Sequence, residues 1–168
     1  MLKSVFGILA TTPDKIRREI AAMSPRELRV RPAPGKWSVQ EIVAHLEDIE
    51  QVGFRERVEA IVEQDGPLLL PVDQEKRAVE LHYYRRDSKQ MLASWARQRR
   101  ANLAWLRKLR PALLKRQGTH QEVGEISVQE LVCEWAFHDL GHLRQILEVK
   151  RYALYPHIGT MQAFYKLS

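Results

Sequence analysis

The sequence predicts an all-α fold, a four-helix bundle made by one domain that spans residues 1–168. Apolar residues recur three and four positions apart in four separate segments, and no segment alternates apolar and polar residues as a half-buried strand would. Capping signals stand in front of the helical segments. A chain of 168 residues can bury a core without disulfides or structural metals. Helices without strands bury their apolar faces by packing into bundles.

The first helix is expected over residues 12–23. Thr12 would cap it, Pro13 would occupy its first turn, where the missing N–H costs nothing, and Ser24-Pro25 would end it.

The second helix is expected over residues 39–64, after a connector rich in proline at 29–37. Ser38 and Glu41 have the spacing of a capping box, in which each side chain binds the other residue's backbone N–H. The sequence Asp65-Gly66-Pro67 should stop this helix.

The third helix should follow Asp87 and end before Pro111, and the fourth should run to about residue 150. Ser127 and Glu130 form a second capping box at the start of the fourth helix. The two boxed helices begin alike, since GKWSVQEIV and GEISVQELV share six identical positions. Chance similarity between two capping boxes and internal duplication both explain this.

Three segments lie outside the expected helices. Residues 67–86 begin as a proline-bounded loop and then fit either a short helix or an extended passage, Gly118 and Gly124 bracket another loop, and residues 151–168 show no clear pattern.

Basic residues are concentrated in the third helix. The chain carries a net charge of +6, whereas residues 85–110 alone hold nine basic residues and one acid, a local balance of +8. A solvated helix face explains this pattern, and the alternatives are a funnel for anionic substrates or a weak phosphate-backbone site. A nucleic-acid interaction would use Arg97, Arg99 and Arg100.

The one cysteine, Cys133, cannot form an internal disulfide, and its expected role is packing. This agrees with a cytoplasmic location, which we predict. No stretch reaches the roughly 18 to 20 apolar residues of a membrane span, so no membrane partner is expected. The amino-terminal stretch MLKSVFGILATTPDK should belong to the fold.

Three of the six histidines fall on stripes that should face the core. His45 lies between Ile42 and Ile49 on the second helix, and His138 and His142 continue the apolar stripe of the fourth. A buried imidazole without a partner costs on the order of 1–3 kcal/mol. His82, His120 and His157 fall in expected loops or the tail, and we assign them no role.

A divalent metal ion would satisfy all three core histidines. Residues four apart on a helix lie one above the other, so His138 and His142 can share one ion, which His45 from a facing helix would complete. Imidazole ligands suit Zn²⁺ or Ni²⁺ best, with Fe²⁺ as a further candidate. Spacing alone leaves open a histidine group that binds no metal.

Two acids near these histidines allow two interpretations each. Glu134, one turn before His138, could be a fourth ligand or a base, or a carboxylate at the rim of the site. Asp48, three residues after His45, could orient that imidazole, or it could be a solvated acid.

The segments PAPGKWSVQEIVAHLEDIE and GEISVQELVCEWAFHDLGHLRQI resemble the DinB/YfiT-like superfamily over roughly residues 10–150. The elements that carry the resemblance are Trp37-Ser38, His45-Leu46, the pair His138 and His142, and Gln145-Ile146.

The resemblance implies a four-helix bundle that holds a divalent ion with His45, His138 and His142, and it makes a homodimer an expectation. Family members include thiol S-transferases that use bacillithiol or related low-molecular-weight thiols, and a mycothiol-dependent isomerase. A thiol-binding residue set is not recognisable here, so the substrate does not transfer.

We therefore predict a metal-dependent thiol S-transferase or hydrolase acting on a small molecule. The alternatives are a non-catalytic metal or ligand-binding module, and a nucleic-acid interaction protein.

Overall fold

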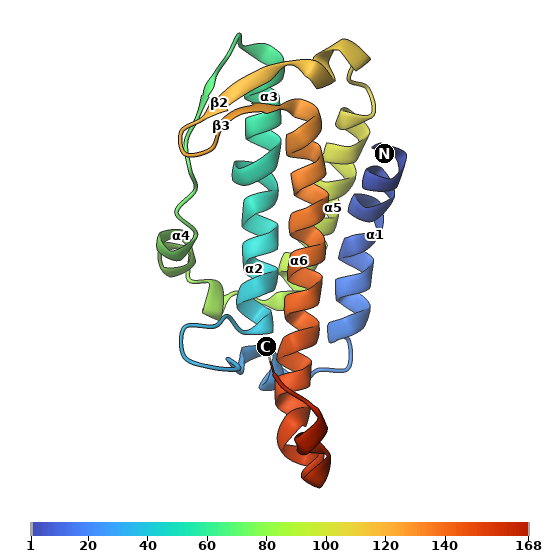
Figure 1. Ribbon diagram of the computed structural model, residues 1–168, viewed down its shortest axis with the longest axis vertical. Helices are drawn as coiled ribbons and strands as arrows, with labels where there is room; N and C mark the ends of the chain where they lie inside the picture. The colour runs from blue at the N-terminus through green and yellow to red at the C-terminus, as the bar shows by residue number, and fades with distance from the viewer. Residues whose placement is uncertain (1, 168) are drawn as a thin grey trace.

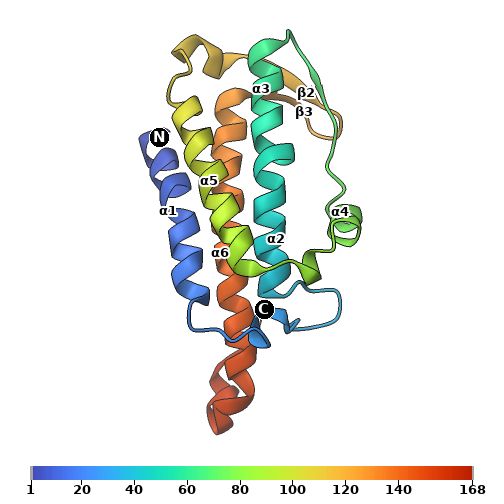
Figure 2. The same ribbon diagram turned by 180° about the vertical axis from the view of Figure 1, so that it is seen from behind.

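The computed structural model describes residues 2–167, and long helices lie side by side along its length (Figure 1). They are α1 (Leu2–Ile20), α2 (Val39–Ile49), which continues through a π-helix (Glu50–Arg55) into α3 (Glu56–Glu63), α5 (Ser88–Leu106) and α6 (Val128–Leu154). Helix α6 packs against α1 and α2, and α5 packs against the same two helices from the opposite side (Figure 2). The predicted four-helix bundle is confirmed.

The predicted start of the first helix is wrong, because α1 begins at Leu2 and runs straight through Pro13. Thr12 is not a cap, and its hydroxyl donates to the Ile8 carbonyl at 2.7 Å. Proline inside a helix leaves the carbonyl four residues earlier without its N–H donor. Here that carbonyl, on Leu9, accepts a hydrogen bond from Arg99 Nη1 of α5 at 2.8 Å. A distant residue thus lets the helix pass through its proline.

The second predicted helix has the expected bounds and one unexpected feature. The Ser38–Glu41 capping box forms at its start. The π-helix that interrupts it has hydrogen bonds between residues five apart instead of four, a distortion often found at functional sites. Gly53 lies inside the π-helix, where a Cβ would stand 2.4 Å from Ile49 Cγ1. Only glycine fits this close approach without a shift of Ile49.

The third and fourth predicted helices are also present. Helix α5 ends at Leu106, four residues before the expected boundary. Helix α6 begins at the Ser127–Glu130 capping box and extends to Leu154, slightly beyond the expected end. After it, the 3-10 helices Tyr155–His157 and Gly159–Phe164 project beyond the bundle (Figure 1).

A small sheet and a short helix cover one side of the bundle, and the expectation of no strands is wrong. Strand β1 (Leu68–Leu69) pairs in parallel with β2 (Gln117–His120), which pairs antiparallel with β3 (Gly124–Ser127). These strands have two to four residues, too few to show alternation. Helix α4 (Gln74–Glu80) and the 3-10 helix Tyr83–Arg85 lie within residues 67–86, where a short helix was one of the two alternatives. The remaining 3-10 helices are Glu27–Arg29 and Pro111–Lys115.

A buried ionic network ties the helices together. Arg99, only 2% exposed, donates to Glu50 at 2.8 Å and to Asp139 at 2.6 Å. The indole N–H groups of Trp95 and Trp135 both donate to Glu50 Oε2, at 3.0 and 3.1 Å. Arg99 is therefore a core residue and not part of a solvated basic face, which corrects one member of the expected basic surface.

Within residues 2–167, no helix is both long and apolar enough to cross a membrane. Cys133 is partly buried against the apolar core, in agreement with the predicted packing role.

Candidate metal centre

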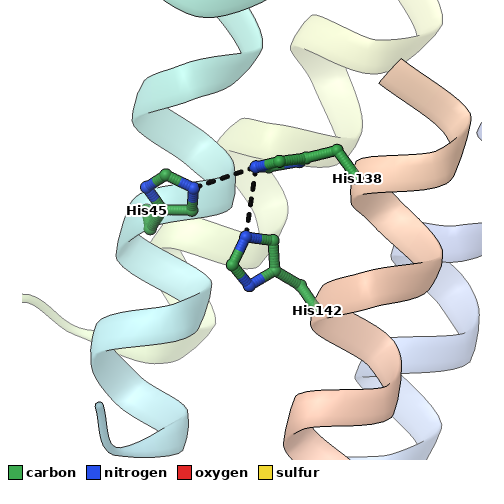
Figure 3. A group of neighbouring side chains, drawn as sticks. All are labelled: His45, His138 and His142. Atoms are coloured by element: carbon green, nitrogen blue, oxygen red, sulfur yellow. Dashed lines mark hydrogen bonds between the residues drawn. The ribbon is translucent and has the colours of Figure 1, made fainter. Parts of the chain in front are cut away.

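The three predicted histidines meet between α2 and α6 (Figure 3). His138 Nε2 lies 3.1 Å from His45 Nε2 and 3.1 Å from His142 Nε2. His45 is fully buried, and the other two are partly accessible. The capping box at Ser38 fixes the start of α2, and the i, i+4 spacing on α6 stacks its two imidazoles. The structure brings together all three candidates.

The convergent nitrogens fit a metal ion better than mutual hydrogen bonds. His142 Nδ1 donates to Gln145 Oε1 at 2.8 Å, so His142 Nε2 carries a lone pair that faces the other imidazoles. One His138 Nε2 atom can donate to one neighbour or accept from one, and it cannot satisfy both short contacts well. Two nitrogens bound to one ion at about 2.1 Å lie roughly 3.0–3.4 Å apart. The two separations from His138 Nε2 match that requirement, and all three nitrogens lie within 4.8 Å of one another.

Aromatic packing holds the rings of His45 and His138. Their Nδ1 atoms are buried and have no hydrogen-bond partner among the residues described. The Trp37 ring centroid lies 4.9 Å from that of His45, and the Phe54 ring meets His138 edge-on at 5.2 Å. Phe54 belongs to the π-helix, which thereby reaches the histidine group.

Asp48 neither orients His45 nor is a solvated acid, the two roles considered for it from sequence. Its carboxylate is half-buried and accepts hydrogen bonds from Arg77 Nε and from the Tyr83 hydroxyl, both at 2.6 Å. It therefore anchors the segment that contains α4 and the following 3-10 helix to α2, and it does not orient His45.

Burial keeps the histidines neutral and their lone pairs available. The pKa of His45 is lowered to about 3 and that of His138 to about 2, first by burial and second by the repulsion that a proton on His142 would exert on a proton at either ring. The pKa of His142 is also lowered by burial, although the bond to Gln145 opposes this. Neutral imidazole is the form that binds metals.

These lowered pKa values predict acid sensitivity of the metal-free protein. Below pH 6.5 the unfolded chain protonates His45 and His138 while the folded chain does not. Stability is therefore fully present above pH 6.5 and should fall as pH drops toward the folded pKa values, by roughly 1 kcal/mol per pH unit for each histidine. Urea unfolding between pH 7 and 4.5 measures this, and because carboxylates also titrate toward the lower end of that range, the share of a histidine is taken from the difference in slope between parent and variant.

The matched comparison uses His45→Leu, which should lose one histidine's share of that slope, and His157→Gln in the exposed tail, which should not. Identical slopes in all three proteins would show that buried neutral imidazoles do not cause the acid sensitivity.

Two cavities adjoin the histidines. The larger has a volume of about 630 Å³ and touches both His138 and His142, and the smaller, of about 170 Å³, touches His138. Glu134 lines both cavities, and its carboxylate is not among the atoms that converge with the histidines. Glu134 is exposed overall, but the protein around its carboxylate desolvates it in part and raises its pKa, while the positive charges of Arg57 and His120 oppose this. Glu134 is therefore a carboxylate at the rim of the site, and it lines the cavities beside the histidines.

His120, to which we assigned no role from its position in the sequence, lines the smaller cavity at the end of β2. The strand pairing that brings it there is not visible in local sequence.

The sequence profile described as the DinB superfamily matches residues 8–146 of the chain. The chain belongs to the DinB superfamily. The matched region of this DinB-superfamily protein includes all three histidines and the residue that orients one of them, Gln145.

Curated relatives and a solved structure agree with the superfamily assignment. The chain is 25% identical over 134 residues, 80% of its length and 77% of the relative's, to an Oceanobacillus iheyensis protein provisionally named a metal-dependent hydrolase. A second protein of that organism with the same provisional name is 26% identical over 140 residues, 82% of this chain and 79% of the other.

The solved structure is YfiT from Bacillus subtilis, provisionally described as a metal-dependent hydrolase with an unusual four-helix bundle topology. It superposes with a TM-score of 0.82 at 21% identity, and the match covers 89% of this chain and 85% of YfiT. The DinB-superfamily chain therefore shares the YfiT fold.

Gln145 should tune the metal affinity of the DinB-superfamily site. Its carbonyl fixes the His142 tautomer and ring orientation, and removing such a partner typically weakens metal binding about 10–100-fold. We expect that loss for Gln145→Ala in a competition titration with a chromophoric chelator. Gln129→Ala, elsewhere on α6, is the control and should bind as tightly as the parent. Equal affinities for the two variants would remove Gln145 from the site.

Proposed function

We propose that the protein is a divalent-metal-dependent enzyme, of hydrolase or thiol S-transferase type, with His45, His138 and His142 as its metal ligands. The observation that carries the proposal is the convergence of three imidazole nitrogens within 4.8 Å of one another, with His138 Nε2 3.1 Å from each of the other two, beside a cavity of about 630 Å³. A cavity of that size is ordinary for a small-molecule substrate.

The donor set supports Zn²⁺ or Ni²⁺, with Fe²⁺ as a further candidate, since all three ligands would be imidazoles. When bound, such an ion supplies a Lewis acid that lowers the pKa of a water or thiol and polarises the group it attacks. Three protein ligands would leave positions for other molecules.

The chain's own residues supply the rest of the chemistry. Gln145 holds the proton on His142 Nδ1, and Trp37 and Phe54 pack against the rings of His45 and His138 and hold them in place. Glu134, which lines both cavities, would accept a proton from the attacking nucleophile and pass it to the leaving group. Its raised pKa suits that exchange.

The names of the two Oceanobacillus relatives favour the hydrolase type. The thiol S-transferase type rests on the family resemblance. A paired screen separates them: model esters and amides on one side, and bacillithiol, mycothiol, glutathione or cysteine with electrophiles on the other. Turnover by metal-loaded parent protein but not by His142→Ala supports an enzyme, and its substrate identifies the type. Metal binding without turnover in any assay would favour the non-catalytic module.

The nucleic-acid alternative needs a revised test, because Arg99 is a core residue. Arg97 and Arg100 are exposed on α5 and can be replaced without touching the ionic network. We expect Arg97→Glu with Arg100→Glu to leave metal content unchanged. Salt-dependent binding of parent protein to DNA or RNA that this variant loses would support the alternative.

We further propose that the protein is cytoplasmic and forms a homodimer, the latter being common in the family it resembles. Analytical ultracentrifugation at micromolar concentration measures the homodimer.

A further inference from the structure

The larger cavity runs along α6, and its lining combines aromatic and charged side chains. Pro32, Lys36 and Trp37 form one wall, and residues of α6 between Glu134 and Tyr152 form the other. Aromatic rings of Trp37 and Phe137 line it beside the histidines, and the Trp37 ring lies nearly parallel to that of His142, at 6.5 Å and 11°. An aromatic or other flat apolar group can stack here.

Two cations of this cavity lack a counter-ion. Lys36 and Arg144 both line it, and neither side chain makes an ion pair or hydrogen bond with any residue in the described part of the chain. The negative charges of the two acids that line the cavity are balanced by other cations. Glu148 accepts two hydrogen bonds from Arg151, at 2.7 and 2.8 Å, and Glu134 interacts with the positive charge of Arg57. The charge left over in the cavity is positive.

A glycine keeps the cavity open beside the histidines. Gly141 lies in the middle of α6, between His138 and His142, and lines the cavity. A Cβ added there would meet no heavy atom of the described residues within 4 Å, so packing does not require glycine. Glycine is the weakest helix former after proline, and a glycine at such a place often permits a close approach of ligand to backbone. A larger side chain at this position would project into the cavity.

We propose that the substrate of this site is an organic anion with an apolar, preferably aromatic, body that lies across Gly141 and against Trp37, with its charge between Lys36 and Arg144. That the bound anion is a substrate rests on the proposed function, but its binding in this cavity requires no metal. The positive rim attracts the anion, and the apolar wall and the flat glycine surface admit its body. Cationic and neutral analogues of the same shape lack the attraction to the positive rim and should bind more weakly.

The test compares three probes of one shape with metal-free protein: 2-naphthoate, 2-naphthamide and 2-naphthylmethylamine. Isothermal titration should show 2-naphthoate binding about tenfold more tightly than the amide, with the amine weakest, and the preference should shrink as salt is raised. Lys36→Gln with Arg144→Gln should abolish the preference. Lys89→Gln with Arg100→Gln, exposed cations of α5, should preserve it.

Substitutions of Gly141 provide the second part of the test. Gly141→Leu should weaken binding of naphthoate and naphthamide alike by at least about tenfold, whereas Gly141→Ala should raise the Tm by about 2–4 °C. Gly7 is the matched control, because it is also a helical glycine with open space at its Cβ and lies outside the cavity. Gly7→Leu should leave probe binding unchanged.

Equal affinity for the three probes, no binding below millimolar concentration, or full binding by Gly141→Leu would each overturn this proposal. Metal content is measured separately on the same proteins. Normal metal binding with no probe preference would refute the substrate class alone, and probe preference without metal binding would refute the proposed function alone.

Discussion

Replacing Arg99 with leucine should lower the free energy of unfolding by about 3–5 kcal/mol, because it leaves two buried carboxylates without their counter-charge. Glu50 and Asp139 are both fully buried and both bind this guanidinium. The Leu9 carbonyl, left without a helical donor by Pro13, would lose its partner as well. Urea unfolding followed by circular dichroism at pH 7 measures the loss.

The neighbouring Arg100 provides the control, since it is exposed, and Arg100→Leu should change stability by no more than about 0.5 kcal/mol. A compensated variant separates charge from shape: Arg99→Leu with Glu50→Gln and Asp139→Asn should recover part of the lost stability. If Arg99→Leu unfolds at the same urea concentration as Arg100→Leu, the ionic network does not stabilise the core.

The features that sequence predicted are those that local spacing determines. Both capping boxes form because Ser38 and Glu41, and Ser127 and Glu130, need only each other. The three histidines were found because i, i+4 spacing and apolar stripes place side chains on known helix faces.

The features that sequence missed depend on partners far along the chain. Where α1 passes through Pro13, Arg99, 86 residues later, supplies the missing donor to the Leu9 carbonyl. From sequence, Arg99 could not be distinguished from the other cations of the basic third helix. In the fold it is buried between Glu50 and Asp139, which come from other helices. Likewise His120 reaches the site through strand pairing.

Removing one metal ligand should have the largest effect on function. His142→Ala takes away one of three convergent nitrogens and should weaken metal binding by well over the 10–100-fold that losing an orienting partner costs. Metal that binds only the folded protein stabilises it by about 2.7 kcal/mol at 100 times its Kd. Added Zn²⁺ or Ni²⁺ should therefore raise the Tm of parent protein and leave that of His142→Ala nearly unchanged.

Exposed histidines provide the control for this comparison. His157→Ala, in the tail beyond the bundle, should show the same metal-dependent rise in Tm as the parent protein. A rise of equal size in His142→Ala would mean that the metal stabilises the protein from another place.

Metal analysis of protein purified without a nickel column tests the central claim most directly. After reconstitution with Zn²⁺ or Ni²⁺ and removal of excess ion, elemental analysis should find about one ion per chain in the parent and close to none in His45→Ala, His138→Ala and His142→Ala. Equal metal content in parent and variants, or none in any of them, would contradict a metal centre built from His45, His138 and His142.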